Sequence, residues 1–405
     1  VKARSVRVSL MAVDGVRRWS LMVVHADVSP ILLEWARKRS RIDDDEFARQ
    51  FPIYERWISG TALPTLKQLE SFAKRTHAPL GFLFLAEPPN EPVPIPDFRT
   101  VTAESIEHPS ADLLDTVYTC QSRQEWYRDH QLRNGEVSLG FVGSITLRTP
   151  VDDAAEELRT HLAWTAEART RLGSWEAAIT QMRERAEALG LLVMISGIVG
   201  SNTRRKLNPR EFRGFALVDG YAPVVFVNGA DSKAAQVFTL AHELAHVWLG
   251  ETGLDDLDPR SEQRYQIERW CSQVAAELLV PLEEFSALFA PQRGLAAQLQ
   301  PLAQHFRVST QVILGRAREA GHLSWEEFLL ELRVEQERVA EFVTQGGGGG
   351  GNFYNTKPVQ VGKRFARELI GSTLEGWTSY TEAFRLLGVQ KSSTFEGLAE
   401  QLGVR

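Results

Sequence analysis

Apolar residues in the first part of the chain recur at steps of three and four. Within residues 30–85 this spacing runs through PILLEWARKRS, DDDEFARQF and PTLKQLESFAKRTHAPLGFLFL, with turn-forming residues between them. Such spacing places the apolar side chains on one face of a helix. It predicts four or five short helices packed into one unit, and a helical pattern returns over residues 105–190.

The pattern changes near residue 189, where Val, Ile and Phe become frequent. LGLLVMISGIVG (189–200) and FRGFALVDGYAPVVFVN (212–228) are typical of strands, and Asp219-Gly220 within the second predicts a tight hairpin turn. The sequence therefore predicts a small antiparallel sheet. Because Pro223 has no N–H to donate to a central ladder, we expect its strand to lie at an edge of that sheet.

Polar residues interrupt the next apolar segment, FTLAHELAHVWLG at 238–250, which we interpret as one helix containing two histidines and a glutamate. After the acidic loop ETGLDDLDP, a second long helix is predicted over 261–279, and Pro281 ends it. Residues 301–328 predict two or three further helices. An all-helical region thus follows the sheet.

Length and composition limit the class of protein. A chain of 405 residues is long enough for several packed units. Two cysteines, Cys120 and Cys271, fit a reducing compartment, and neither a signal peptide nor a membrane-length apolar run is recognisable, so a cytoplasmic protein is predicted. The net charge of −6 provides no global basic field, so any nucleic-acid contact would need a local patch.

Two histidines at metal-binding spacing carry the candidate chemistry. His242 and His246 are one helical turn apart and face the same side, so both imidazoles can bind one ion. Glu243 projects beside them, where it can act on a water molecule rather than bind the metal. The simpler interpretation is a pair of hydrogen-bonded core histidines, but that would leave the intervening glutamate without a role.

A third ligand is expected on the second long helix. Its apolar stripe includes Ile267, and Glu268 lies at the border of that stripe, whereas Glu277 lies about 180° around the helix from Glu268. We therefore choose Glu268 as the metal ligand. Cys271 is one turn away from it and is interpreted as a small buried thiol. The ligand types favour Zn²⁺, although Mn²⁺ or another divalent cation fits the same set.

The segments FTLAHELAHVWLG and QIERWCSQVAAELLVP (266–281), with the lead-in REFRGFALVDGYAPVVFVNGAD, resemble the ImmA/IrrE family of metallo-endopeptidases over about 185–330. The resemblance implies that His242, His246 and Glu268 are the metal ligands and that Glu243 is the catalytic base. It also implies a gluzincin-like zinc-dependent endopeptidase that cleaves a regulatory protein, such as an Xre-type repressor or an antitoxin, in a stress-response or mobile-element switch.

Residues 30–76 also resemble the helix-turn-helix of Xre-type repressors, through WARKRS, DEFARQF and PTLKQLESFAK. Between Ala48 and Trp57, however, the chain is about one helical turn short at the place where a recognition helix would begin. Residues 22–90 carry nine basic and nine acidic residues, so no net field favours phosphate. We expect protein docking rather than DNA binding. The alternative function is a DNA-binding regulator whose metallopeptidase-like domain is a sensor or scaffold.

The predicted fold class is α+β and predominantly helical, with a zincin-like metallopeptidase domain, a small antiparallel sheet and helical domains on either side. The predicted divisions are an N-terminal extension (1–21), an Xre-like helical domain (22–85), a Pro-rich linker (86–99), a helical connecting region (100–184), the metallopeptidase domain (185–335), a Gly linker (346–351) and a C-terminal helical appendage (352–405).

Three points stay open at this stage. The extension is either an upstream translation artefact before Met22 or a basic arm. The oxyanion-stabilising group is unassigned, with Tyr265, His305 and His322 as candidates. Residues 215–228 either dock a substrate as an added strand or form a purely structural hairpin.

Overall fold

The computed structural model of the chain describes residues 7–8, 24–91, 98–100, 109–250, 262–345 and 353–404. Most of the predicted N-terminal extension, part of the Pro-rich linker, the acidic loop and the Gly linker lie outside these residues. The chain divides into two compact units, one formed by residues 1–94 and 102–115 and the other by 95–101 and 116–405.

The first unit is a small helical domain. Its elements are the antiparallel pair β1 (Arg7–Val8) and β2 (Val24–His25), the helices α1 (Pro30–Ser40), α2 (Asp44–Gln50), α3 (Tyr54–Ile58) and α4 (Leu66–Thr76), and the 3-10 helix η1 (Leu80–Phe84). Phe47, Trp57 and Phe72 pack edge to face in its core. With five residues, α3 is roughly 7–8 Å long, which is short for a helix that reads DNA.

The second unit contains a four-stranded sheet in the order β3-β7-β8-β4. The strands are β3 (Phe98–Thr100), β4 (Leu192–Ser196), β7 (Phe212–Leu217) and β8 (Val224–Asn228). The predicted hairpin is confirmed, because β7 and β8 pair antiparallel. The Asp219 carboxylate shapes its turn by accepting hydrogen bonds from the Tyr221 and Ala222 amides, at 2.8 and 2.9 Å. A separate two-stranded sheet joins β5 (Ile198–Val199) to β6 (Asn202–Lys206).

Two details of the predicted sheet are wrong. The sheet is mixed rather than antiparallel, because β4 runs parallel to β8. The strand that follows Pro223 is central, since β8 lies between β7 and β4. Pro223 stands one residue before the strand and contributes only its carbonyl, which accepts from the Leu192 amide at 2.9 Å. The absence of an N–H group at Pro223 therefore removes no hydrogen bond from the sheet.

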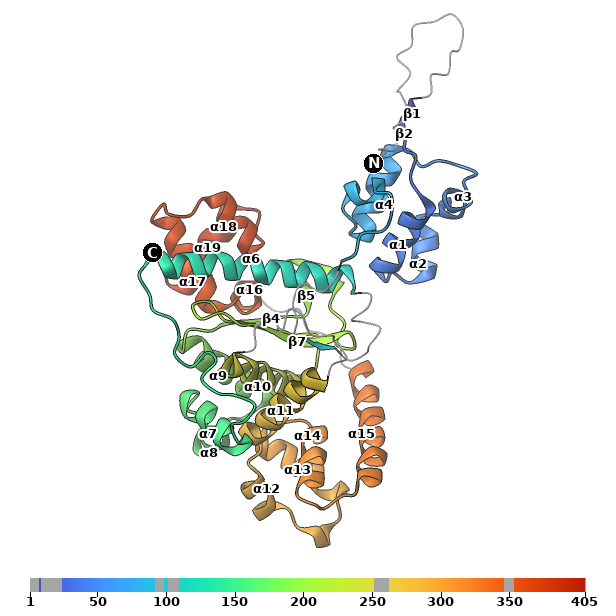
Figure 1. Cartoon of the computed structure of the whole chain (residues 1–405). Coiled ribbons are helices and arrows are strands. Elements are labelled where there is room, and N and C mark those ends of the chain that lie inside the picture. The colour runs from blue at the N-terminus through green and yellow to red at the C-terminus, as the bar shows by residue number, and fades with distance from the viewer. Residues whose placement is uncertain are drawn as a thin grey trace, which may run out of the picture. The chain divides into compact units, whose positions relative to one another are not determined.

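Helices cover both faces of this sheet (Figure 1). On one side lie α9 (Trp175–Ala188) and α10 (Lys233–Leu249), and on the other lie α6 (Ala111–Arg133) and α16 (Phe353–Val361). The residues of β4 alternate accordingly: Val193 and Ile195 belong to the core under α10, whereas the sulfur of Met194 is 3.8 Å from Cys120 of α6. A strand covered on both faces is buried along its whole length, as β4 is, and four of its five residues are apolar.

The remaining helices complete the second unit. They are α7 (Val151–His161), α8 (Ala166–Thr170), α11 (Glu262–Leu279), α12 (Leu282–Leu288), η2 (Pro291–Arg293), α13 (Ala296–Phe306), α14 (Thr310–Glu319), α15 (Trp325–Gln345), α17 (Lys363–Leu374), α18 (Tyr380–Leu387) and α19 (Ser392–Leu402). The α+β, mainly helical class is confirmed. None of the helices in the described part of the chain combines the length and apolarity that a bilayer crossing requires.

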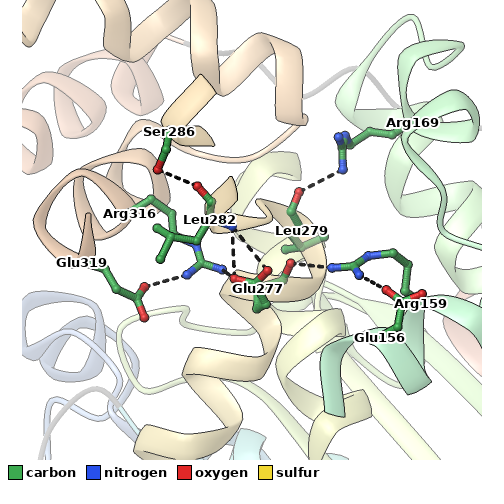
Figure 2. A network of polar contacts seen from close by, with 9 residues as sticks. All are labelled: Glu156, Arg159, Arg169, Glu277, Leu279, Leu282, Ser286, Arg316 and Glu319. Carbon is green, nitrogen blue, oxygen red and sulfur yellow. Dashed lines mark hydrogen bonds and ion pairs between the residues drawn. The ribbon is translucent and has the colours of Figure 1, made fainter. Parts of the chain in front are cut away.

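A network of charged groups, centred on the buried Arg316 and Glu277, joins α11 to its neighbours (Figure 2). The Glu277 carboxylate pairs with Arg316 of α14 at 2.6 Å and accepts from the Leu282 amide that begins α12. Arg159 of α7 donates to the Glu277 carbonyl at 3.0 Å, and Arg316 also pairs with Glu319 at 2.7 Å. Glu277 therefore holds three helices around the end of α11.

The C-terminal helices, expected as an appendage, belong to the same compact unit as the sheet. The Glu187 carboxylate of α9 accepts from the Lys363 and Arg364 amides at the start of α17, at 2.6 and 3.2 Å. Lys357 of α16 is 1% exposed, and its Nζ donates to Ser201 Oγ at 2.8 Å. Burial lowers the pKa of Lys357 to about 7, and the nearby Arg123 guanidinium adds to this shift.

The buried Lys357 predicts a pH-dependent stability. Between pH 7 and 10.5 the unfolded chain binds a proton that the folded protein has released, so the free energy of unfolding should rise with pH by roughly 1 kcal/mol per unit. The same stability is lost as pH falls towards 7. Urea titrations across this pH range measure how steeply the free energy of unfolding rises with pH. This rise should be smaller in Lys357→Met and unchanged in Lys363→Met, because the Lys363 side chain is 38% exposed. Parallel curves for wild type and Lys357→Met would contradict the assignment.

Candidate metal centre

Helix α10 is almost wholly buried, and both of its ends are satisfied. Ser232 caps the start by accepting from the Ala235 amide, and Gly250 ends the helix with φ 72°. The Gly143 amide donates to the Val247 carbonyl at 3.2 Å, so a loop from residues 139–149 supplies donors for the last turn. A side chain at Gly250 would meet the Gly143 Cα at 2.4 Å. This close packing fixes the rotation of the helix within the core.

Three predicted site residues come together between α10 and α11. The Nε2 atoms of His242 and His246 lie 3.1 Å apart. The Glu268 carboxylate faces both, with 3.2 Å from Oε2 to His242 Nε2 and 3.7 Å from Oε1 to His246 Nε2. The histidine side chains are 0% and 4% exposed, whereas that of Glu268 is 26% exposed. Solvent therefore reaches the group from the Glu268 side.

These separations fit a single tetrahedral ion. Ligand atoms at 2.0–2.1 Å from such an ion lie about 3.3 Å from one another, which the three observed distances bracket. The ligand atoms of His242, His246 and Glu268 all lie within 4.8 Å of each other. Oε1 of Glu268 is buried and accepts no hydrogen bond from the described residues, as expected of an atom that is placed to bind a cation.

Residues from α11 hold the far side of each imidazole. Ser272 Oγ is 3.3 Å from His242 Nδ1, and Cys271 Sγ is 3.5 Å from His246 Nδ1. Partners at Nδ1 orient a ring so that Nε2 points at the metal position. Cys271 is thus a buried thiol behind a histidine, as predicted for its packing. Ser272 was not predicted, although its position one helical turn after Glu268 was a usable signal.

Glu243 lies on α10, which packs against one face of the sheet, and Glu243 is 1% exposed. A Cβ built on Gly214 of β7 would be 3.0 Å from Glu243 Oε1, 2.8 Å from the Phe226 carbonyl oxygen and 2.5 Å from Thr239 Cγ2. Only glycine allows β7 to approach α10 this closely. The sequence signal was a glycine inside a predicted strand, which often marks a close backbone approach.

A cleft of about 1280 Å³ opens beside this group of residues. Its wall includes Ser272, which contacts His242, and Phe238, whose ring centroid is 6.5 Å from that of His242. Arg213 of β7 and Arg269 of α11 also line it. A cleft of this size next to the candidate ligands can admit a peptide segment.

The three candidates for stabilising an oxyanion differ in their position relative to the cleft. Tyr265 is 63% exposed and lines the cleft. His305 Nε2 is 2.9 Å from a Glu284 carboxylate oxygen, and His322 stacks on Phe289 with ring centroids 4.4 Å apart. Of the three, only Tyr265 belongs to the cleft wall, so it is the candidate that stays in place.

Comparison with known families agrees with this geometry. Residues 186–318 match the model of the IrrE N-terminal-like domain, Peptidase M78, and residues 361–401 match a domain of unknown function, DUF8813. No match was found among curated proteins. The first match supports the ImmA/IrrE resemblance and a metallopeptidase-type function, and the helices with their small sheet fit a zincin-like fold. The Xre-like character of residues 22–85 stays a prediction.

The close approach of β7 to α10 predicts a specific sensitivity at Gly214. Gly214→Ala should lower the free energy of unfolding by about 1–3 kcal/mol, because the added carbon overlaps Thr239 and the Phe226 carbonyl. Chemical denaturation measures the change. Gly315→Ala in α14, where nothing lies within 4 Å, is the matched control and should be neutral or stabilising. Equal effects of the two substitutions would be inconsistent with this packing.

Proposed function

We propose that this protein is a metal-dependent endopeptidase in which His242, His246 and Glu268 bind the ion and Glu243 is the general base. The observation that carries the proposal is the convergence of two Nε2 atoms and one carboxylate within 4.8 Å, beside a cleft that Ser272 and Phe238 line. The peptidase-family match over the same helices supports it. Zinc is the metal we favour from the ligand types, with manganese as the alternative.

A divalent ion held by these ligands would polarise the scissile carbonyl and acidify the attacking water. Glu243 would accept the proton of that water and pass it to the leaving amine. Its burial under Gly214 restricts the carboxylate to a small range of positions. Tyr265, at the cleft wall, is the proposed second donor to the developing negative charge.

We propose a protein substrate bound in an extended conformation. The strand β7 carries Gly214, on which an added Cβ would lie 3.0 Å from Glu243 Oε1, and a peptide added to the edge of this strand would run past Glu243. The resemblance to the ImmA/IrrE family favours a DNA-binding repressor or an antitoxin as that substrate. Cleavage of such a protein would switch on the genes that it represses.

The ligand assignment predicts the effect of one carboxylate on metal content. Glu268→Gln should lower the affinity for Zn²⁺ by more than about tenfold, because it replaces a charged ligand with a weakly binding amide. Elemental analysis after dialysis against a zinc buffer measures the change. Glu262→Gln, an exposed position on the same helix, serves as control and should retain the metal. Similar metal loss in both variants would remove Glu268 from the site.

The role of Glu243 predicts a separation of binding from hydrolysis. Glu243→Gln should keep the metal content of the wild type. Its rate of peptide cleavage should be lower than that of the wild type by about 10²–10⁴-fold. Mass spectrometry of fragments from a repressor encoded beside the gene, and from a peptide library, provides the measurement. A variant that cleaves as fast as wild type would eliminate this base. Bound metal without cleavage by wild type would favour the sensor or scaffold alternative.

A further inference from the structure

The β7 edge beside the candidate site is already occupied by the chain itself. The short strand β3, which comes from the segment between the N-terminal unit and α6, pairs antiparallel with β7. Its register places Phe98 opposite Phe215, Arg99 opposite Gly214 and Thr100 opposite Phe212. The pairing covers the half of β7 that contains Gly214.

Gly214 connects this pairing to the chemistry. It is the β7 residue whose added Cβ would lie 3.0 Å from Glu243 Oε1. The backbone at Arg99 therefore runs one strand spacing, about 4.8 Å, from the backbone at Gly214. An extended substrate that used the same edge would need the backbone donors and acceptors that β3 now engages.

The opposite edge of the sheet does not offer an equivalent surface near the site. There β4 is the last strand, and α16 and α17 pack against it (Figure 1). A Cβ on Gly362, between those helices, would be 3.4 Å from the Val193 carbonyl oxygen. Helix α10 contacts β7 and β8, so within the described part of the chain the edge bordering Glu243 is the one that carries β3.

We propose that β3 is an internal occupant of the substrate-docking edge and that a substrate strand must displace it. This inference rests on the proposed peptidase function and adds a regulatory step to it. A three-residue strand forms few backbone hydrogen bonds, each with a small net free energy, so displacement is energetically accessible. The resting protein would then bind extended peptides more weakly than a protein whose edge is free.

The test removes two adjacent backbone N–H groups of β3 in the full chain carrying Glu243→Gln, so that no hydrolysis complicates the readout. Arg99→Pro with Thr100→Pro eliminates both N–H groups, whereas Arg99→Ala with Thr100→Ala retains them. Hydrogen exchange over residues 212–217 is followed by mass spectrometry. We expect about tenfold faster exchange in part of this segment for the proline variant only. Unchanged exchange in a variant with wild-type circular dichroism would overturn the proposal.

A second measurement uses a fluorescent peptide of residues 95–101, IPDFRTV, added to the same zinc-loaded variants. Anisotropy should show about tenfold tighter binding to the proline variant than to the alanine variant. Thr100→Pro alone should give a smaller shift in the same direction, and provides the comparison if the double variant does not fold. Equal affinities across all variants would mean that β3 does not block the edge.

These readouts are independent of catalysis, so the two proposals fail separately. Exchange and peptide binding can change as expected although no variant with intact Glu243 cleaves any peptide. That result would support β3 as the occupant of the β7 edge and would contradict the peptidase function. Intact-mass analysis of the zinc-loaded wild type also distinguishes an occupant from a substrate. A chain that remains uncut within residues 95–101 supports the proposal, and cleavage there would overturn it.

Discussion

The free-energy cost of burying polar groups in α10 is the constraint on which the rest of the structure depends. His242, Glu243 and His246 lie in a helix that is otherwise apolar and enclosed, and their removal from water is unfavourable without partners. Helix α11 provides such partners, with the Glu268 carboxylate in front of the rings and Ser272 behind one of them. The packing of α10 on α11 and the chemistry of the site are therefore one arrangement.

The packing of the sheet on α10 is a second constraint on the site. The strand β7 approaches α10 at a glycine, which brings an extended backbone edge next to Glu243. The edge proposed to dock a peptide and the candidate metal centre thereby lie within one compact unit. The strand β3 pairs with β7 along that edge, which is the basis of the proposed displacement step.

The parts of the chain outside the peptidase-family match contribute to the same unit. Helix α6 precedes the match and α16 follows it, yet both lie on the second face of the sheet, where Cys120 and Gln124 of α6 contact Met194 and Leu217. The Glu187 carboxylate caps α17, and Lys357 is buried against the β5–β6 turn. A sheet whose strands are apolar on both faces requires cover on both sides. The C-terminal helices are thus part of the support for the site.

The sequence alone determined the elements that depend on local pattern. Periodicity and turn residues predicted α10, α11 and the β7–β8 hairpin, and the i, i+4 spacing with helix-face geometry selected His242, His246 and Glu268 as the set that the structure brings together. Tertiary structure decided whatever depends on residues distant in sequence. It made β8 central and parallel to β4, brought Gly214 against Glu243 and placed β3 on β7, because strand order and edge pairing are fixed by packing and not by periodicity.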